Sequence, residues 1–182
     1  MLYRIHFSGD IRKLYHQTMY MSPDSPQGLL SKVLFKIILY FCRRGRENIR
    51  ELDSSDFEIK YDADGRKYIT NIKSVHTKHH QRTTNEDESD GGRMYATGSI
   101  MCPVSSFALF QHPKSSFGDD DNEWYENKPI GKNMLGSFMA NLSTQAKLFE
   151  VYTNHCIRAT TIKELNREGF KDRDIIAVSG LL

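Results

Sequence analysis

The chain has 182 residues, 38% hydrophobic and 26% charged, which is enough for one soluble domain with a core of its own. The formal net charge is only +2, so the overall charge points to no class of partner, and a nucleic-acid surface would need local clusters of basic residues. Three widely spaced cysteines without a CxxC pair argue against a disulfide scaffold or a zinc ribbon.

No segment has the pattern of a signal peptide or a membrane span. The first residues lack a long apolar stretch. The strongest apolar run, Val33 to Cys42, is about half as long as a membrane-spanning helix and contains Lys36. We therefore expect an intracellular protein with no membrane partner.

Helix-breaking residues end the first segment of the chain. They run from Ser22 to Pro26, so we expect residues 1–24 to be a remnant or linker and residues 25–182 to form the domain. A helix should follow, with Ser25 as its N-cap and Pro26 in its first turn. Its predicted core-facing stripe consists of Leu29, Leu30, Val33, Leu34, Ile37, Ile38 and Phe41.

The next stretch predicts a small antiparallel sheet. Four arginines between Arg43 and Arg50 follow directly on the apolar helix. Alternating apolar residues predict a strand over 57–61, Asp62 to Gly65 a turn, and residues 67–69 the start of a return strand. Residues 74–92 form a long polar stretch that favours a loop, and residues 93–96 are expected to form a third strand.

The remainder is expected to be helical with one interruption. A short helix is predicted over 102–111, a loop over 114–122, a short buried insert at 124–125 and an amphipathic helix over 133–142. A longer helix should begin after Thr153 or Asn154 and stop at Gly169, and a last one should span residues 172–178. The expected fold class is therefore α+β, mostly α with a small antiparallel sheet.

The strongest chemical motif is His155-Cys156-Ile157-Arg158, just inside a capped helix start. His155 and Arg158 are three residues apart and should share a helical face. A histidine exchanges protons near neutral pH, and an arginine can hold a phosphate through two nitrogens. The pair suits phosphoryl transfer, in which charge on the phosphate oxygens must be stabilised, but the short pattern also fits a helix cap or a surface.

Three stretches of the sequence carry a family resemblance. They are residues 41–52, residues 128–132 and residues 152–161 around Thr153-Asn154-His155-Cys156-Ile157-Arg158, with Ala177-Val178-Ser179-Gly180 behind them. Over roughly residues 25–180 the chain resembles the catalytic domain of tyrosine recombinases and integrases. More closely, it is similar to the domesticated Crypton-type recombinase domain at the C-terminus of MYM-type zinc-finger and glutamine-rich nuclear proteins. This resemblance implies that fold, a transposon origin, double-stranded DNA and nuclear proteins as partners, a nuclear location, and no cofactor.

The resemblance also implies a set of site residues. The catalytic groups of the family are an Arg, a Lys, His-x-x-Arg, a second His or Trp, and a Tyr nucleophile. They carry over to Arg44 (with Arg46 as the alternative), Lys78 (with Lys73 second), His155 and Arg158. Nucleic-acid contacts are expected from Arg43, Arg44, Arg46, Lys132 and Arg158. The alternatives are a solvated basic surface for the arginines and an ordinary loop lysine for Lys78.

The match departs from the family pattern at its end. The family continues Ser-Gly-His, whereas Ser179-Gly180 is followed here by Leu181, and all nine tyrosines precede His155. The sequence ends before the family position of the nucleophile, and residues 1–24 are too few for the clamp domain that normally precedes this one. Because a phosphotyrosine intermediate needs the tyrosine hydroxyl, we expect a degenerate domain that binds nucleic acid and is not an active enzyme.

Three other interpretations stay open. The fold could be a scaffold for protein interactions in a nuclear transcriptional regulator, with its arginines simply on the surface. The chain could be a gene fragment whose exposed apolar helix faces leave it marginally stable. His76, His79 and His80 suggest a zinc site, but they lie in a predicted loop without a nearby cysteine, so no metal site is expected.

Overall fold

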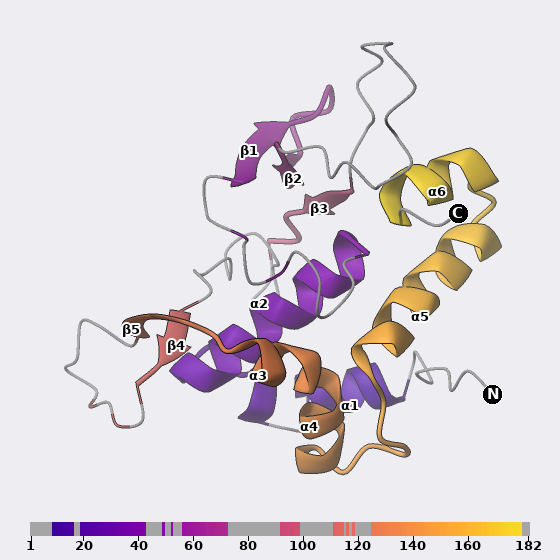
Figure 1. Cartoon of the computed structure of the whole chain (residues 1–182). Helices are drawn as coiled ribbons and strands as arrows, with labels where there is room; N and C mark the ends of the chain where they lie inside the picture. Colours follow the sequence, from indigo (N-terminus) through magenta and orange to yellow (C-terminus); the bar gives the residue numbers. More distant parts are fainter. Residues whose placement is uncertain are drawn as a thin grey trace.

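The computed structural model describes residues 9–16, 19–42, 49, 52, 56–72, 92–98, 111–114, 116, 118 and 125–179. These residues combine helices with two small antiparallel sheets, which confirms the α+β class (Figure 1). No helix in these ranges is long and apolar enough to cross a bilayer. In chain order the elements are α1 (Asp10–His16), the 3₁₀ helix η1 (Met19–Met21), α2 (Pro26–Tyr40), β1 (Phe57–Tyr61), β2 (Lys67–Asn71), β3 (Arg93–Tyr95), β4 (Gln111–Pro113), β5 (Tyr125–Pro129), α3 (Lys132–Gly136), α4 (Phe138–Gln145), α5 (Asn154–Arg167) and α6 (Asp172–Ser179).

Helix α2 begins where its sequence predicts. The Ser25 hydroxyl accepts a hydrogen bond from the Gly28 amide at 3.1 Å, and Pro26 occupies the first turn. The predicted apolar stripe is buried except for Leu29, which is partly buried, and Ser31, Lys32 and Lys36 on the other faces of the helix are buried as well. The helix is therefore enclosed on all sides from Leu30 to Ile38, so the surroundings of this central part differ from those of a helix with one core-facing stripe.

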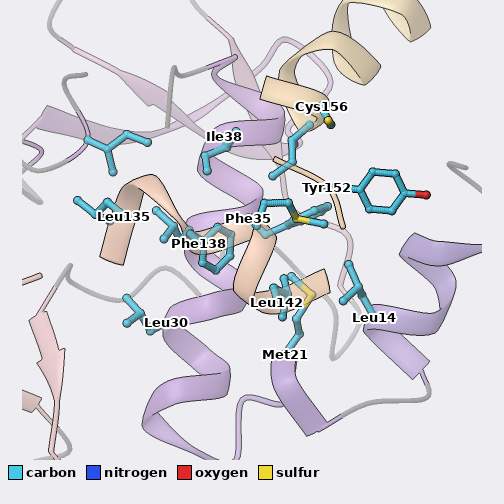
Figure 2. Close-up of a cluster of buried hydrophobic side chains, with 14 of the residues drawn as sticks. Leu14, Met21, Leu30, Phe35, Ile38, Leu135, Phe138, Leu142, Tyr152 and Cys156 are labelled. Carbon is cyan, nitrogen blue, oxygen red and sulfur yellow. The ribbon is translucent and has the colours of Figure 1, made fainter. Parts of the chain in front are cut away.

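Two apolar clusters extend from α2. The larger one gathers side chains of α1, η1, α2, α3, α4 and α5, and Figure 2 shows Phe35, Phe138 and Leu142 within it. The smaller one joins α2 to the three-stranded sheet through Val33, Ile37, Phe41, Ile69 and Met94. The helix thus connects the two halves of the fold.

Two described elements of the segment expected to be a remnant or linker, α1 and η1, pack into the larger cluster. Leu14 is fully buried and Met21 is 3% exposed. The Tyr15 ring meets the Phe35 ring edge to face at 6.1 Å. The buried Tyr152 hydroxyl donates a hydrogen bond to the Asp10 carboxylate at 2.5 Å, across 142 positions of the chain. The N-terminal residues therefore share a core with the segment that leads into α5.

The predicted hairpin and third strand are confirmed. β1 pairs antiparallel with β2, and β2 with β3, in the order β1-β2-β3. The Asp62 carboxylate accepts hydrogen bonds from the Asp64 and Arg66 amides, which closes the turn, and Gly65 supplies the positive φ of 75°.

The second half departs from the helical expectation at one place. Strands β4 and β5 form a two-stranded sheet, so Gln111, expected at the end of a helix, lies in a strand. The rest of that expected helix and Trp124 lie outside the described residues. The predicted helix over 133–142 divides at Ser137, whose amide and hydroxyl both donate to the Asn133 carbonyl. Helices α5 and α6 confirm the last two expectations.

Replacing Leu14 with Ala tests whether the N-terminal segment belongs to the core. We expect the free energy of unfolding to fall by about 2–5 kcal/mol, because the truncation leaves a cavity. Urea denaturation followed by circular dichroism measures the change. Met19→Ala is the matched control, since Met19 is 83% exposed in the same segment and should shift stability by no more than about 0.5 kcal/mol. Equal, small effects of both substitutions would contradict the packing.

Candidate nucleic-acid interface

The start of α5 is fixed by a buried asparagine. Asn154 accepts a hydrogen bond from the Met139 amide at 2.9 Å and donates to the Leu135 carbonyl at 2.7 Å. It thereby satisfies one free amide at the start of α4 and one free carbonyl at the end of α3. The asparagine in the motif is thus a structural bridge between three helices.

In the first turn of α5, Cys156 occupies the position that a glutamate usually holds in a capping box. The Thr153 amide donates to the Cys156 sulfur at 3.4 Å, and the Thr153 hydroxyl lies 3.4 Å from the same sulfur. The side chain at the third helical position thus reaches back to the N-cap residue, as in a capping box. This contact holds the motif at the end of the helix that Asn154 anchors.

His155 and Arg158 differ sharply in their surroundings. The imidazole of His155 is exposed, whereas Arg158 is only 4% exposed. Arg158 donates a hydrogen bond from Nη2 to the Ser179 carbonyl at 2.5 Å. Ser179 is the last residue of α6, so the guanidinium satisfies a carbonyl that the helix itself leaves open, at the negative end of its dipole. The shared helical face predicted for the pair therefore runs from solvent at His155 into the protein at Arg158.

The same part of α5 contacts the end of α2. The Thr161 hydroxyl donates to the Leu39 carbonyl at 2.9 Å and also contacts the Cys42 thiol. Burial raises the pKa of Cys42 to about 11, against the opposing effects of the nearby Arg158 charge and the Thr161 hydroxyl. The thiol is therefore neutral at physiological pH, and Arg158 lies near the last described residue before the arginine cluster.

Other predicted site residues are only partly covered by the structure. Lys132 is the first residue of α3 and is exposed. In the described ranges, no group of three or more His, Cys, Asp or Glu side chains is placed to hold a metal ion. The predicted residues outside the described ones are Arg43, Arg44, Arg46, Lys73, Lys78, His76, His79, His80 and Leu181.

Several residues at this site have roles that sequence reasoning missed. Asn154 was visible as a capping residue type, but its bonds to α3 and α4 depend on the tertiary fold. The same holds for Ser179, whose carbonyl receives Arg158, and for Thr161, which ties α5 to α2. No local pattern identifies such partners, because each lies on a different element.

No protein-family model matches this chain, and no curated protein matches it either. The resemblance to tyrosine recombinases therefore stays a prediction from the motifs themselves.

Asn154→Ala should destabilise the fold by about 1–3 kcal/mol, because it leaves the Met139 amide and the Leu135 carbonyl buried without their partner. Urea denaturation measures the loss. Asn141→Ala is the matched control: Asn141 is exposed on α4 and bonds only to the neighbouring Ser137 hydroxyl at 3.3 Å in the described structure. That change should be neutral or slightly stabilising, since Ala favours a helix. A loss for Asn141→Ala as large as for Asn154→Ala would refute the bridging role.

The Cys42 thiol should make stability fall at high pH. Its pKa in the folded chain, about 11, lies above the ordinary value of 9.0, so the folded state keeps the proton longer than the unfolded state. The contribution is fully present below pH 9 and is lost as the pH rises toward 11, by up to about 2–3 kcal/mol. Urea denaturation at a series of pH values would show a steeper fall for the wild type than for Cys42→Ala. The variant controls for tyrosines that titrate in the same range, and parallel curves would argue against a buried thiol.

Proposed function

We propose that this chain is a degenerate, tyrosine-recombinase-like domain that binds double-stranded DNA without cleaving it. One observation carries the proposal: the end of α2 lies against the part of α5 that holds the His-x-x-Arg motif. Cys42 and Arg158 are 116 positions apart in the chain, yet the Arg158 charge acts on the Cys42 thiol. The Thr161 hydroxyl, one turn after Arg158, also donates to the Leu39 carbonyl at 2.9 Å. The described start of the first motif stretch, Phe41 and Cys42, therefore follows directly on a contact between α2 and α5.

Chain connectivity strengthens this argument. Arg43 follows Cys42 directly in the sequence, and Arg44 and Arg46 come one and three residues after Arg43. In the sequence, the arginine cluster therefore begins one residue after the end of the α2–α5 contact at Cys42. Several positive charges that lie close together attract a phosphate backbone even when the net charge of the chain is near zero.

The basic side chains near the α2–α5 contact differ in how directly they could bind a phosphate. His155 is exposed on α5 and available to a ligand. Arg158 is buried and bonded to the Ser179 carbonyl, so its charge acts from beneath the surface. The arginine cluster is accordingly the main source of phosphate contacts in this proposal, and Lys132 contributes from the exposed start of α3.

The proposal includes no strand cleavage. Residues 153–182 contain no tyrosine. Tyr152, next to the motif, is fully buried and its hydroxyl is bonded to Asp10. A phosphotyrosine intermediate needs a hydroxyl in line with the phosphorus atom, which Tyr152 cannot provide from the core.

A second candidate function is a protein-interaction scaffold in a nuclear regulator. It is favoured by Arg158, whose bond to Ser179 already gives the motif arginine a structural use. It is also favoured by Phe149 and Val151, which are 78% and 62% exposed in the segment that precedes the motif. A nuclear location and nuclear protein partners belong to both proposals through the resemblance.

Replacing Arg43, Arg44 and Arg46 together with Ala tests DNA binding. Fluorescence anisotropy with a labelled duplex across a salt series should give at least about a tenfold loss of affinity at low salt. The plot of log affinity against log salt should flatten by about 0.9 for each phosphate contact removed. Arg158 is left intact because its loss would also release α6. Wild-type protein that fails to bind duplex at low salt, or a triple variant that binds unchanged, would remove the basis for the proposal.

Arg167→Ala is the matched control for this experiment. Arg167 is exposed at the far end of α5 and bonded to Glu164 at 2.7 Å, so its loss should leave affinity and salt slope unchanged. In a parallel assay a nicked suicide duplex should yield no covalent protein–DNA adduct; an adduct would overturn the inactivity. Binding to a protein partner that is insensitive to salt, together with no affinity for duplex, would favour the scaffold instead.

A further inference from the structure

Within the described strands, β1 is an edge strand. It pairs with β2 on one side only and forms the edge of the sheet opposite β3 (Figure 1). Most of its residues are exposed, including Ile59 at 54% and Tyr61 at 65%. An edge strand presents backbone amides and carbonyls that a further strand can use.

The register identifies which backbone groups point outward. The Asp62 amide donates to the Arg66 carbonyl at one end of the hairpin, and the Ile72 amide donates to the Asp56 carbonyl at the other. Hydrogen-bonded and non-hydrogen-bonded pairs alternate in an antiparallel ladder, so the pairs of Glu58 and Lys60 with β2 are the hydrogen-bonded ones. The amide and carbonyl of Ile59, which lies between these two pairs, therefore face away from β2.

The same residue carries an apolar side chain on one face of the sheet. Ile59 pairs with Ile69, and Ile69 with Met94, so the three side chains form one row across the sheet. Ile69 and Met94 are buried against α2, whereas Ile59 extends beyond this cover. An added strand would continue the apolar row and cover Ile59.

The charged side chains on the opposite face of β1 indicate which strand would pair with this edge. Within one chain, the Lys60 ammonium lies 3.2 Å from a Glu58 carboxylate oxygen, and both side chains are exposed. If β1 pairs antiparallel with itself about Ile59, Glu58 meets Lys60 of the second copy, and Lys60 meets Glu58 of that copy. Phe57 then lies opposite Tyr61 of the second copy, an aromatic pair. A parallel pairing, or a pairing centred on Glu58 or Lys60, would place like charges side by side.

We propose that β1 is a self-association edge, at which two copies of this chain join their three-stranded sheets antiparallel and in register about Ile59. The paired segment is only five residues long, so the dimer is weak and depends on concentration. The proposal does not depend on DNA binding, because it uses neither the arginine cluster nor α5.

Analytical ultracentrifugation of the full chain tests the proposal. From micromolar to millimolar concentration, the wild-type mass should rise from 21.1 kDa toward twice that value. Glu58→Lys and Lys60→Glu should each weaken self-association at least about tenfold, because each places four like charges together. Mixed in equal amounts, these two variants should form a one-to-one heterodimer, since every lysine then faces a glutamate.

Ile59→Pro supplies an independent measurement. Proline removes the outward amide but no hydrogen bond to β2, so association should be lost while circular dichroism stays native. The charge variants keep the test valid if the proline variant unfolds, because both positions are exposed. A wild-type chain that stays monomeric at millimolar concentration overturns the proposal. So does a dimer that persists in both charge variants, or a mixture of them that shows no heterodimer.

Discussion

The enclosure of α2 determines where the other described elements lie. Its apolar side chains supply both clusters, one shared with the other helices and one with the sheet. The same enclosure buries two cations, Lys32 and Lys36, which is costly unless each has partners. The Lys36 ammonium lies 5.9 Å from the centre of the Tyr15 ring, so α1 contributes polar compensation as well as apolar contact. This explains why the first helix is part of the core.

Packing against α2 also determines what Arg158 can do. The guanidinium caps the end of α6 through the Ser179 carbonyl, which is a structural use of the motif arginine. This hydrogen bond does not itself neutralise the guanidinium, because a carbonyl is a dipole without a net charge. A buried charge is screened less than an exposed one and raises the local potential for anions. Structural and electrostatic roles of Arg158 are therefore compatible, and a phosphate would need contacts from the exposed neighbours.

Elements whose signals are local were predictable from the sequence. Ser25 with Pro26, the turn from Asp62 to Gly65, and Gly169 after α5 each encode a boundary through one residue's conformation or hydrogen bond. Elements that depend on distant partners were not. The β4–β5 pairing has no alternating pattern to reveal it, and the core position of Asp10 depends on Tyr152, 142 residues later. The HxxR spacing was visible, but the burial of Arg158 was not, since its partner belongs to α6.

At the edge of β1, the register of the β1–β2 pairing determines which backbone groups of the five residues face outward, and hence which partner the edge can bind. The sequence Phe-Glu-Ile-Lys-Tyr is symmetric in chemical type about Ile59, but the symmetry matters only if the Ile59 amide faces outward. The Glu58–Lys60 pair within one chain is exposed, and such pairs contribute about 0–1 kcal/mol. Exchanging the one pair in each copy for two pairs between the copies therefore costs little. Burial of Ile59 and Tyr61 then supplies affinity, and the charges supply register. A substitution that preserves the apolar row but reverses one charge should therefore change which partner is selected more than how tightly a matched partner binds.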